Sequence, residues 1–343
     1  MNIKSLLLGS AAALAAVSGA QAADAIVAAE PEPLEYVRVC DAFGAGFFYI
    51  PGSETCLKIG GYVRFQTNIG RDASNGGTPS ATSTSDWDSF TRAQLEIDTR
   101  SDTEFGALRG FIGLRGDADS SSSRGVNVDQ AFIEIGGLKV GYYYNWWDDG
   151  LSGETDDLAA GTTRFNSIRY TYTAGAAYAG VAVDELEGVA RPGETDNNVG
   201  IEAIVGGKFG PAAVALLGGY DTDQSEGAVR IIATADLGPG TLGLAGVWAS
   251  GPNAYYDTSE WAVAVEYAVK VTDKFKITPG FQYYDSLKNA AGTDFGDNNA
   301  WKAGLTFDYQ LAKNLSAKAS VQYLDPDNAS ESWSGYLRLQ RAF

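Results

Sequence analysis

The chain has 343 residues, of which 45% are hydrophobic and 20% are charged, and its 43 Asp and Glu outnumber its 25 Lys and Arg to give a net charge of −18. It contains no His, which excludes Ser-His-Asp, Cys-His and His-ligated metal chemistry; we expect no enzyme, no metal site and no cofactor. An acidic chain also lacks the clustered cations that bind phosphate backbones, so no nucleic-acid partner is expected. The length suits either two soluble domains or one large β-barrel.

The first 22 residues have the form of a secretory signal peptide. Lys4 precedes a short apolar run, and Ala20-Gln21-Ala22 has the small-x-small pattern of a cleavage site. Residues 1–22 are therefore predicted to be removed, and no later apolar run is long enough for a membrane-spanning helix. Residues 23–56 follow as an acidic N-terminal tail and a segment that contains both cysteines.

The two cysteines are predicted to form one structural disulfide. Cys40 and Cys56 are the only pair in the chain, and an exported protein enters an oxidising compartment. A redox-active pair would more often have Cys-x-x-Cys spacing, and a metal site would need additional ligands nearby.

From residue 57 to residue 343 the sequence alternates between apolar and polar residues in segments of about ten. In residues 301–311 every odd position is apolar and every even position is polar or Gly. Sixteen such segments are predicted as strands: 57–67, 90–101, 107–116, 128–136, 138–145, 165–173, 177–186, 199–208, 212–220, 227–237, 242–249, 260–271, 275–284, 300–311, 315–325 and 333–343.

The connections between these strands alternate in length. The even-numbered ones are tight, as at Gly136-Gly137, whereas the odd-numbered ones include 68–89, 145–164, 187–198 and 285–299. Short turns on one rim, long loops on the other and an even strand count are typical of outer-membrane barrels. The predicted fold is all-β: a 16-stranded antiparallel transmembrane β-barrel with short periplasmic turns and long external loops.

Aromatic residues and the C-terminus agree with this prediction. Tyr and Trp gather near strand ends, where an amphipathic ring prefers the membrane interface, whereas a soluble β-protein would scatter them along the strands. The last strand ends on Phe343, and a terminal Phe on an amphipathic strand resembles the signal by which barrel proteins are recognised for membrane insertion.

Both ends of the chain resemble one family. The segment YVRVCDAFGAGFFYIPG at 36–52, the segment ETCLKIGGYVR at 54–64 and the RLQRAF ending are similar to the alphaproteobacterial porin family. The resemblance implies a general diffusion porin that assembles as a homotrimer among outer-membrane lipids, including lipopolysaccharide, and whose third long loop folds into the barrel. It also implies a peptidoglycan contact through the Ala-Asp-Ala start at residues 23–25.

Charged residues inside the barrel are expected to set the selectivity of an aqueous channel. The predicted constriction loop, 145–164, carries five carboxylates: Asp148, Asp149, Glu154, Asp156 and Asp157. The predicted basic pore wall consists of five arginines: Arg64, Arg92, Arg109, Arg115 and Arg169. Two alternatives remain open, since the loop could be a solvated external loop and the arginines could form wall salt bridges with Glu96 or Asp98.

The predicted function is passive, weakly cation-leaning diffusion of small hydrophilic solutes and ions across the bacterial outer membrane. A substrate-specific channel of the same architecture is the main alternative, and saturable flux would favour it. A secreted structural or adhesive β-rich protein is less favoured, because it would need no aromatic girdles.

Overall fold

The computed structural model describes residues 38–70, 86–119, 125–189 and 194–343. The predicted signal peptide and most of the predicted N-terminal tail lie outside these residues. Within the described ranges no helix is both long enough and apolar enough to cross a membrane. The helical elements of the described residues are two short 3-10 turns, η1 at Asp41–Phe43 and η2 at Trp146–Asp148.

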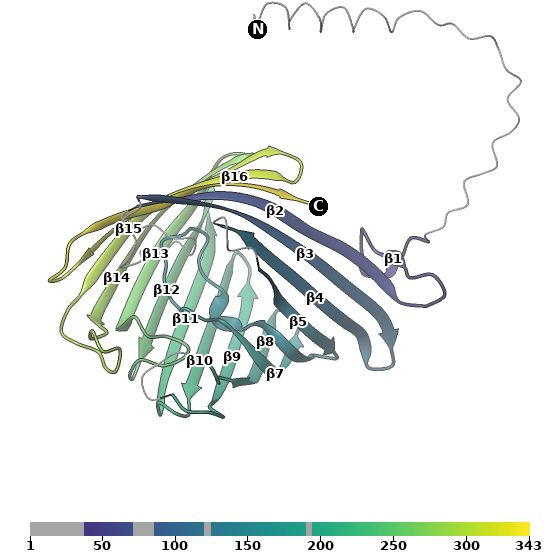
Figure 1. Cartoon of the computed structure of the whole chain (residues 1–343), viewed down its shortest axis with the longest axis horizontal. Helices are drawn as coiled ribbons and strands as arrows, with labels where there is room; N and C mark the ends of the chain where they lie inside the picture. The colour runs from purple at the N-terminus through teal and green to yellow at the C-terminus, as the bar shows by residue number, and fades with distance from the viewer. Residues whose placement is uncertain (1–37, 71–85, 120–124, 190–193) are drawn as a thin grey trace, which may run out of the picture. The chain divides into compact units, whose positions relative to one another are not determined.

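Strands make up nearly all of the ordered structure (Figure 1). Their bounds are β1 Phe48–Tyr49, β2 Cys56–Gly70, β3 Trp87–Thr103, β4 Gly106–Ala118, β5 Val126–Ile135, β6 Leu138–Tyr144, β7 Arg164–Ala174, β8 Ala177–Glu185, β9 Val199–Phe209, β10 Ala212–Asp221, β11 Glu226–Leu237, β12 Gly240–Ala249, β13 Ser259–Thr272, β14 Phe275–Leu287, β15 Ala300–Ala312, β16 Leu315–Pro326 and β17 Ser332–Ala342.

Each strand from β2 to β17 pairs antiparallel with its neighbour in sequence, and β17 pairs with β2 to close the sheet into a barrel. The prediction of a 16-stranded antiparallel barrel is therefore confirmed. The two-residue strand β1 adds to the start of β2 and was not predicted.

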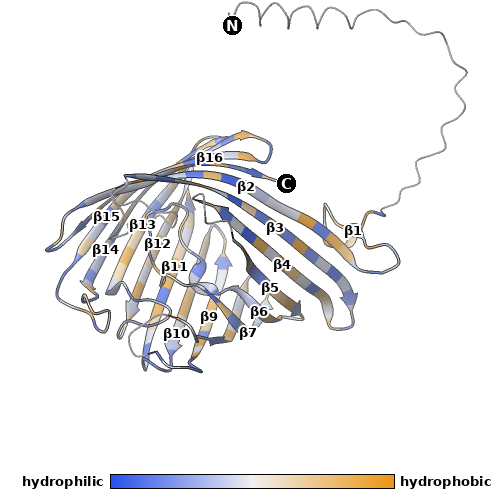
Figure 2. Ribbon diagram, viewed as in Figure 1, coloured by the Kyte–Doolittle hydropathy of each residue, from blue (hydrophilic) through white to orange (hydrophobic). Residues whose placement is uncertain are grey.

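The barrel has an apolar outer face and a polar inner face. Along β2, Val63, Phe65 and Ile69 are exposed, whereas Gln66 and Asn68 between them are buried. The same alternation runs along the other strands as adjacent apolar and polar bands (Figure 2). Large apolar side chains exposed on one whole face indicate that lipid, not water, covers that face.

An aromatic band lies on the outer face towards the end of the barrel that carries the long connections. Trp301 contacts Tyr323 with ring centroids 5.3 Å apart, and Tyr323 contacts Trp333 at 4.8 Å. Trp261 and Tyr283 extend the band at 5.6 Å. Such rings lie at the boundary between lipid tails and head groups.

The disulfide joins Cys40 to Cys56, whose Cα atoms are 6.0 Å apart, and confirms the predicted pairing. Cys56 is the first residue of β2, so the bond ties residues 41–55 to the start of the barrel. Phe47 packs against the buried bond.

Replacing both Cys40 and Cys56 by Ser should destabilise the attachment of residues 41–55 by about 3 kcal/mol, because the closed loop restricts the unfolded segment. Limited proteolysis of the folded barrel would then cut within 41–55 much faster in the variant than in the native protein. Equal cleavage rates would contradict a stabilising role.

Candidate functional site

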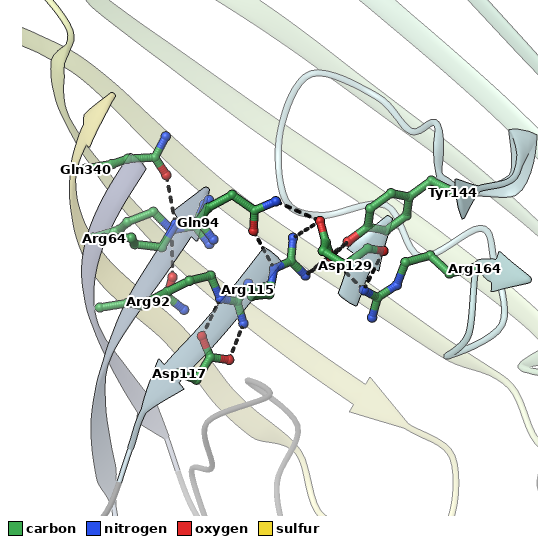
Figure 3. A network of polar contacts seen from close by, with 11 residues as sticks. Arg64, Arg92, Gln94, Arg115, Asp117, Asp129, Tyr144, Arg164 and Gln340 are labelled. Atoms are coloured by element: carbon green, nitrogen blue, oxygen red, sulfur yellow. Dashed lines mark hydrogen bonds and ion pairs between the residues drawn. The ribbon is translucent and has the colours of Figure 1, made fainter. Parts of the chain in front are cut away.

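The barrel wall carries a row of arginines that point into the lumen from three adjacent strands. Arg64 on β2 lies directly opposite Arg92 on β3, and Arg115 on β4 lies opposite Gln94 of β3 (Figure 3). We call Arg64, Arg92 and Arg115 the arginine row. Their strand neighbours Val63 and Phe65 are exposed on the lipid side, which places the arginines on the water-filled side.

Two members of the row are neutralised by carboxylates. Arg92 forms a two-pronged ion pair with Asp117, with N–O distances of 2.7 and 2.8 Å. Arg115 lies 2.9 Å from Asp129 and donates to Gln94 at 3.0 Å. A planar guanidinium matches a carboxylate in this geometry, so these pairs hold the two side chains in fixed positions.

Asp129 connects the row to a fourth arginine that sequence analysis missed. Its carboxylate is 2% exposed and lies 2.6 Å from the guanidinium of Arg164, the first residue of β7. Gln94 and Tyr144 also donate to it. The register of β4 with β5 shifts between Gly113 and Leu114, so this part of β5 does not follow simple alternation.

Arg64 differs from its neighbours, because in the described part of the chain it makes no ion pair with a carboxylate. Its Nε donates to Gln340 Oε1 at 2.8 Å, and its guanidinium lies over the Tyr62 ring. Arg338, on the adjacent strand β17, likewise donates to an amide oxygen, that of Gln66. In the described part of the chain, neither of these two cations is paired with a carboxylate.

The remaining two predicted arginines lie outside the row. Arg109 forms ion pairs with Asp98 at 3.1 Å and with Glu134 at 3.4 Å. Arg169 lies over the rings of Tyr143 and Trp146, 4.8 Å from each centroid. The five predicted arginines therefore do not form one group.

The connection from β6 to β7, residues 145–163, lies against the inner wall of the barrel, and we call it the inner loop. Arg230 on β11 is 3% exposed and binds the inner loop to the wall. The Arg230 guanidinium donates to the carbonyl oxygens of Trp146 at 2.7 Å, Trp147 at 2.8 Å and Leu158 at 3.3 Å.

Three further wall side chains bind the inner loop. Glu266 on β13 accepts from the N–H groups of Gly153 and Thr155. Gln282 on β14 exchanges two hydrogen bonds with the backbone of Asp157, at 2.6 and 2.9 Å. Lys318 on β16 forms an ion pair with Glu154 at 2.7 Å.

Small residues on the wall make room for this contact. A Cβ added at Gly219 of β10 would lie 2.6 Å from the Tyr255 ring and 3.1 Å from the Trp147 indole nitrogen. A Cβ at Gly280 of β14 would overlap the side chain of Thr155. Larger residues at these positions would displace the inner loop from the wall.

A second segment, residues 250–258 between β12 and β13, also packs inside the barrel and was not anticipated. The Tyr255 carbonyl accepts from Ala160 N–H of the inner loop at 2.8 Å. The Tyr255 hydroxyl donates to Asp184 on β8 at 2.8 Å. The segment therefore supports the inner loop from the side that faces β8.

The five loop carboxylates occupy different environments. Glu154 is paired with Lys318, and Asp156 is half-buried and accepts from Leu151 N–H at 3.0 Å. Asp148, Asp149 and Asp157 are exposed, and among the described residues none of the three forms an ion pair. These three are the free negative charges of the inner loop.

The wall position that anchors the inner loop through Arg230 lies on the opposite side of the strand ring from the arginine row. Arg230 anchors the loop to β11, and the row is centred on β3, eight strands away in a closed ring of sixteen. Strands half a ring apart lie opposite each other. Within the described ranges no group of three or more His, Cys, Asp or Glu is arranged to hold a metal ion.

Comparison with known proteins identifies the family. A family model described as the porin subfamily matches residues 24–339. The chain belongs to this porin subfamily. It is an outer-membrane channel for passive diffusion, embedded as a multi-pass β-barrel.

Relatives of this porin extend over its whole length. It is 51% identical to outer membrane protein IIIA of Rhizobium leguminosarum bv. viciae, over 98% of this chain and 93% of that protein. It is 36% identical to porin Omp2b of Brucella suis, over 100% of both chains. Both organisms are alphaproteobacteria, as the resemblance implied.

Solved structures share the fold at low sequence identity. The outer membrane channel DcaP of Acinetobacter baumannii has a TM-score of 0.67 and 12% identity, covering 86% of this porin and 99% of DcaP. OmpT of Vibrio cholerae, described as a trimer form, has a TM-score of 0.64 and 16% identity, covering 85% of this porin and 100% of OmpT.

Proposed function

We propose that this porin conducts small hydrophilic solutes and ions with a weak preference for cations, and that it acts as a channel without enzymatic activity. The inner loop forms the constriction, with Asp148, Asp149, Glu154, Asp156 and Asp157 on its side of the passage. The arginine row forms the opposite wall. Facing rows of opposite charge produce a transverse field that orients dipolar solutes and disfavours bulky apolar ones.

One observation carries the cation preference. Asp148, Asp149 and Asp157 are exposed without an ion pair in the described structure, whereas Arg92 and Arg115 are compensated by Asp117 and Asp129. Three uncompensated carboxylates thus face two arginines without a carboxylate partner, Arg64 and Arg338. The excess of negative charge is small, which is why we propose only a weak preference for cations. A negative field raises the local concentration of cations.

Reversal potentials of the purified porin in planar bilayers test this proposal. In a KCl gradient the potential should have the sign of a channel that favours K⁺ over Cl⁻. An anion-selective channel would contradict the charge argument, and the absence of conductance would contradict the function itself.

As the pH is lowered, the cation preference should begin to fall at a higher pH than it would if the loop carboxylates had the pKa of free Asp. Enclosure inside the barrel raises the pKa of Asp156, and the hydrogen bond from Leu151 N–H only partly offsets this. A raised pKa means that the carboxylate gains its proton at higher pH, so the loop loses charge above the usual Asp range. Reversal potentials measured from about pH 7 to about pH 4 should show this step. Enclosure inside the barrel also raises the pKa of Asp149 and Asp157. The step should therefore become smaller in Asp156→Asn and disappear when all three residues are replaced by Asn, and an unchanged step in that triple variant would assign it to another group.

The assembly and targeting expectations are part of the same proposal. A homotrimer is supported by the OmpT neighbour that is described as a trimer form. Phe343 is proposed as part of the insertion signal; the residue is 58% exposed and its backbone exchanges hydrogen bonds with Gly61 of β2. We also propose that the porin contacts lipopolysaccharide, that residues 1–22 are removed, and that the N-terminal tail is attached to peptidoglycan. Native mass spectrometry of the detergent-solubilised protein would test the trimer directly.

A further inference from the structure

A basic pocket lies inside the barrel near the end that carries the short turns, away from the free carboxylates of the inner loop. It has a volume of about 380 Å³. Its cationic lining residues, which define the basic pocket, are Arg64, Lys270, Lys274, Lys276, Lys318 and Arg338. They come from strands β2, β13, β14, β16 and β17 and from the turn between β13 and β14.

The sheet register sets like charges directly against one another in this pocket. Lys270 on β13 pairs with Lys276 on β14, and Lys318 on β16 pairs with Arg338 on β17. Like charges in directly opposed positions destabilise a sheet. Since the chain as a whole carries a net charge of −18, this concentration of cations runs against its composition.

The carboxylates of the pocket are too few to neutralise it. Asp308 on β15 is shared by Lys276 at 3.2 Å and Lys318 at 3.4 Å. Asp273 is the other acidic lining residue. Glu154 of the inner loop also pairs with Lys318 at 2.7 Å. Six lining cations therefore meet three carboxylates, and a bound anion would supply the missing negative charge.

The lining also favours an oxyanion over a monatomic anion. Amide and hydroxyl groups of Gln310, Gln340 and Ser316 line the same cavity. Ammonium and guanidinium groups that converge from several strands match an anion with several oxygen atoms, and the Arg fork matches phosphate in particular. A chloride ion would contact only part of such a lining.

We propose that the basic pocket is a binding site for a small multivalent oxyanion, a phosphate or phosphate monoester, on the periplasmic side of the constriction. An anion that has passed the constriction is held there transiently before it leaves the channel. Lys318 contacts both Asp308 in the pocket and Glu154 in the inner loop, and Arg64 belongs to both the pocket and the arginine row. The site therefore adjoins the constriction and shares Arg64 with it.

Inorganic phosphate in planar bilayer recordings tests this site. Phosphate added on the short-turn side should reduce the current of the native channel in a saturable way, whereas added chloride at the same ionic strength should not. In the variant Lys270→Gln/Lys276→Gln the concentration for half-maximal block should rise about tenfold, since two converging charges are lost. Neither residue contacts the inner loop through a hydrogen bond or ion pair that the structure describes, so the constriction stays in place.

Lys208→Gln is a control that removes one lysine charge at the same end of the barrel outside the pocket. Lys208 lies opposite Ala213 on β10 at the short-turn end of β9 and does not line the pocket. Phosphate block should be the same in this variant as in the native channel. An equal loss of block in Lys208→Gln would assign the effect to general electrostatics and overturn the pocket.

Calorimetric titration of the native protein in detergent with phosphate gives a second readout that does not depend on conductance. Saturable heat that is lost in Lys270→Gln/Lys276→Gln supports the site. A channel that conducts with its cation preference intact, yet shows neither phosphate block nor saturable heat, would overturn this inference and leave the proposed function standing.

Discussion

Replacing Arg230 with alanine should release the inner loop from the wall and change the conductance of the channel. The substitution removes a donor from three enclosed carbonyl oxygens. Those of Trp147 and Leu158 lose the donor that the structure gives them, whereas that of Trp146 keeps the Asp149 N–H at 3.4 Å. The cost to the bound position of the loop is about 3 kcal/mol or more, because unsatisfied buried acceptors retain their full desolvation penalty. Single-channel recordings should then show a changed mean conductance with frequent transitions between current levels.

Two controls separate this effect from general damage to the barrel. Arg230→Lys keeps the charge but lacks the planar fork that reaches three carbonyls, so it should give an intermediate phenotype. Arg109→Ala removes a lumen arginine that pairs with Asp98 and Glu134 and does not hold the loop, and it should leave the current steady. A quiet, unchanged channel in Arg230→Ala would mean that Glu266 and Gln282 suffice to hold the loop.

Neutralising the three free carboxylates of the inner loop should abolish the cation preference. In the variant Asp148→Asn/Asp149→Asn/Asp157→Asn the loop keeps its shape, since its anchoring contacts use Glu154 and backbone groups. The uncompensated charge of Arg64 and Arg338 then dominates, and the K⁺ to Cl⁻ permeability ratio should fall by about fivefold. The change should be larger at 0.1 M than at 1 M salt, because the screening length falls from about 10 Å to about 3 Å.

The matched variant Glu185→Gln/Glu187→Gln/Asp196→Asn removes the same number of charges outside the inner loop. These residues lie at the end of β8 and in the connection to β9. Their neutralisation should shift the permeability ratio much less. A similar shift in both variants would show that net charge, and not the position of the loop carboxylates, sets the selectivity.

The strands were predictable because lipid and water select opposite residue types on the two faces of each strand. The segments 300–311 and 315–325 correspond to β15 at Ala300–Ala312 and β16 at Leu315–Pro326. Most bounds differ by one to three residues, because a strand continues past the membrane wherever backbone pairing continues.

The contacts that hold the inner loop could not be predicted in the same way. Alternation assigns Arg230 and Glu266 to the inner face, but it does not predict which loop these side chains bind. Glu266 and Thr155 are 111 positions apart, and Gln282 and Asp157 are 125 apart. Asp129 was not predicted as a lumen residue for a different reason, because the register shift beside it breaks the alternation with a period of two.

The segment around Tyr255 gave no sequence signal because its buried residues are small or aromatic and carry no net charge of their own. Asn253, Ala254 and Tyr256 are fully buried. In a connection between two strands such residues resemble an ordinary short external loop. Their role depends on the inner loop, which occupies a volume that only the closed barrel creates.

The seam between β17 and β2 has a consequence for biogenesis. Arg64 and Gln340, which bond across it, are 276 positions apart, and the last residue of the chain bonds to Gly61. Until the final strand is in place, β2 and β16 both expose unpaired backbone groups, which lipid cannot satisfy and which invite pairing with other chains. A barrel without its last strand would leave two open strand edges in lipid, so we expect the β17–β2 seam to close before or during insertion into the membrane.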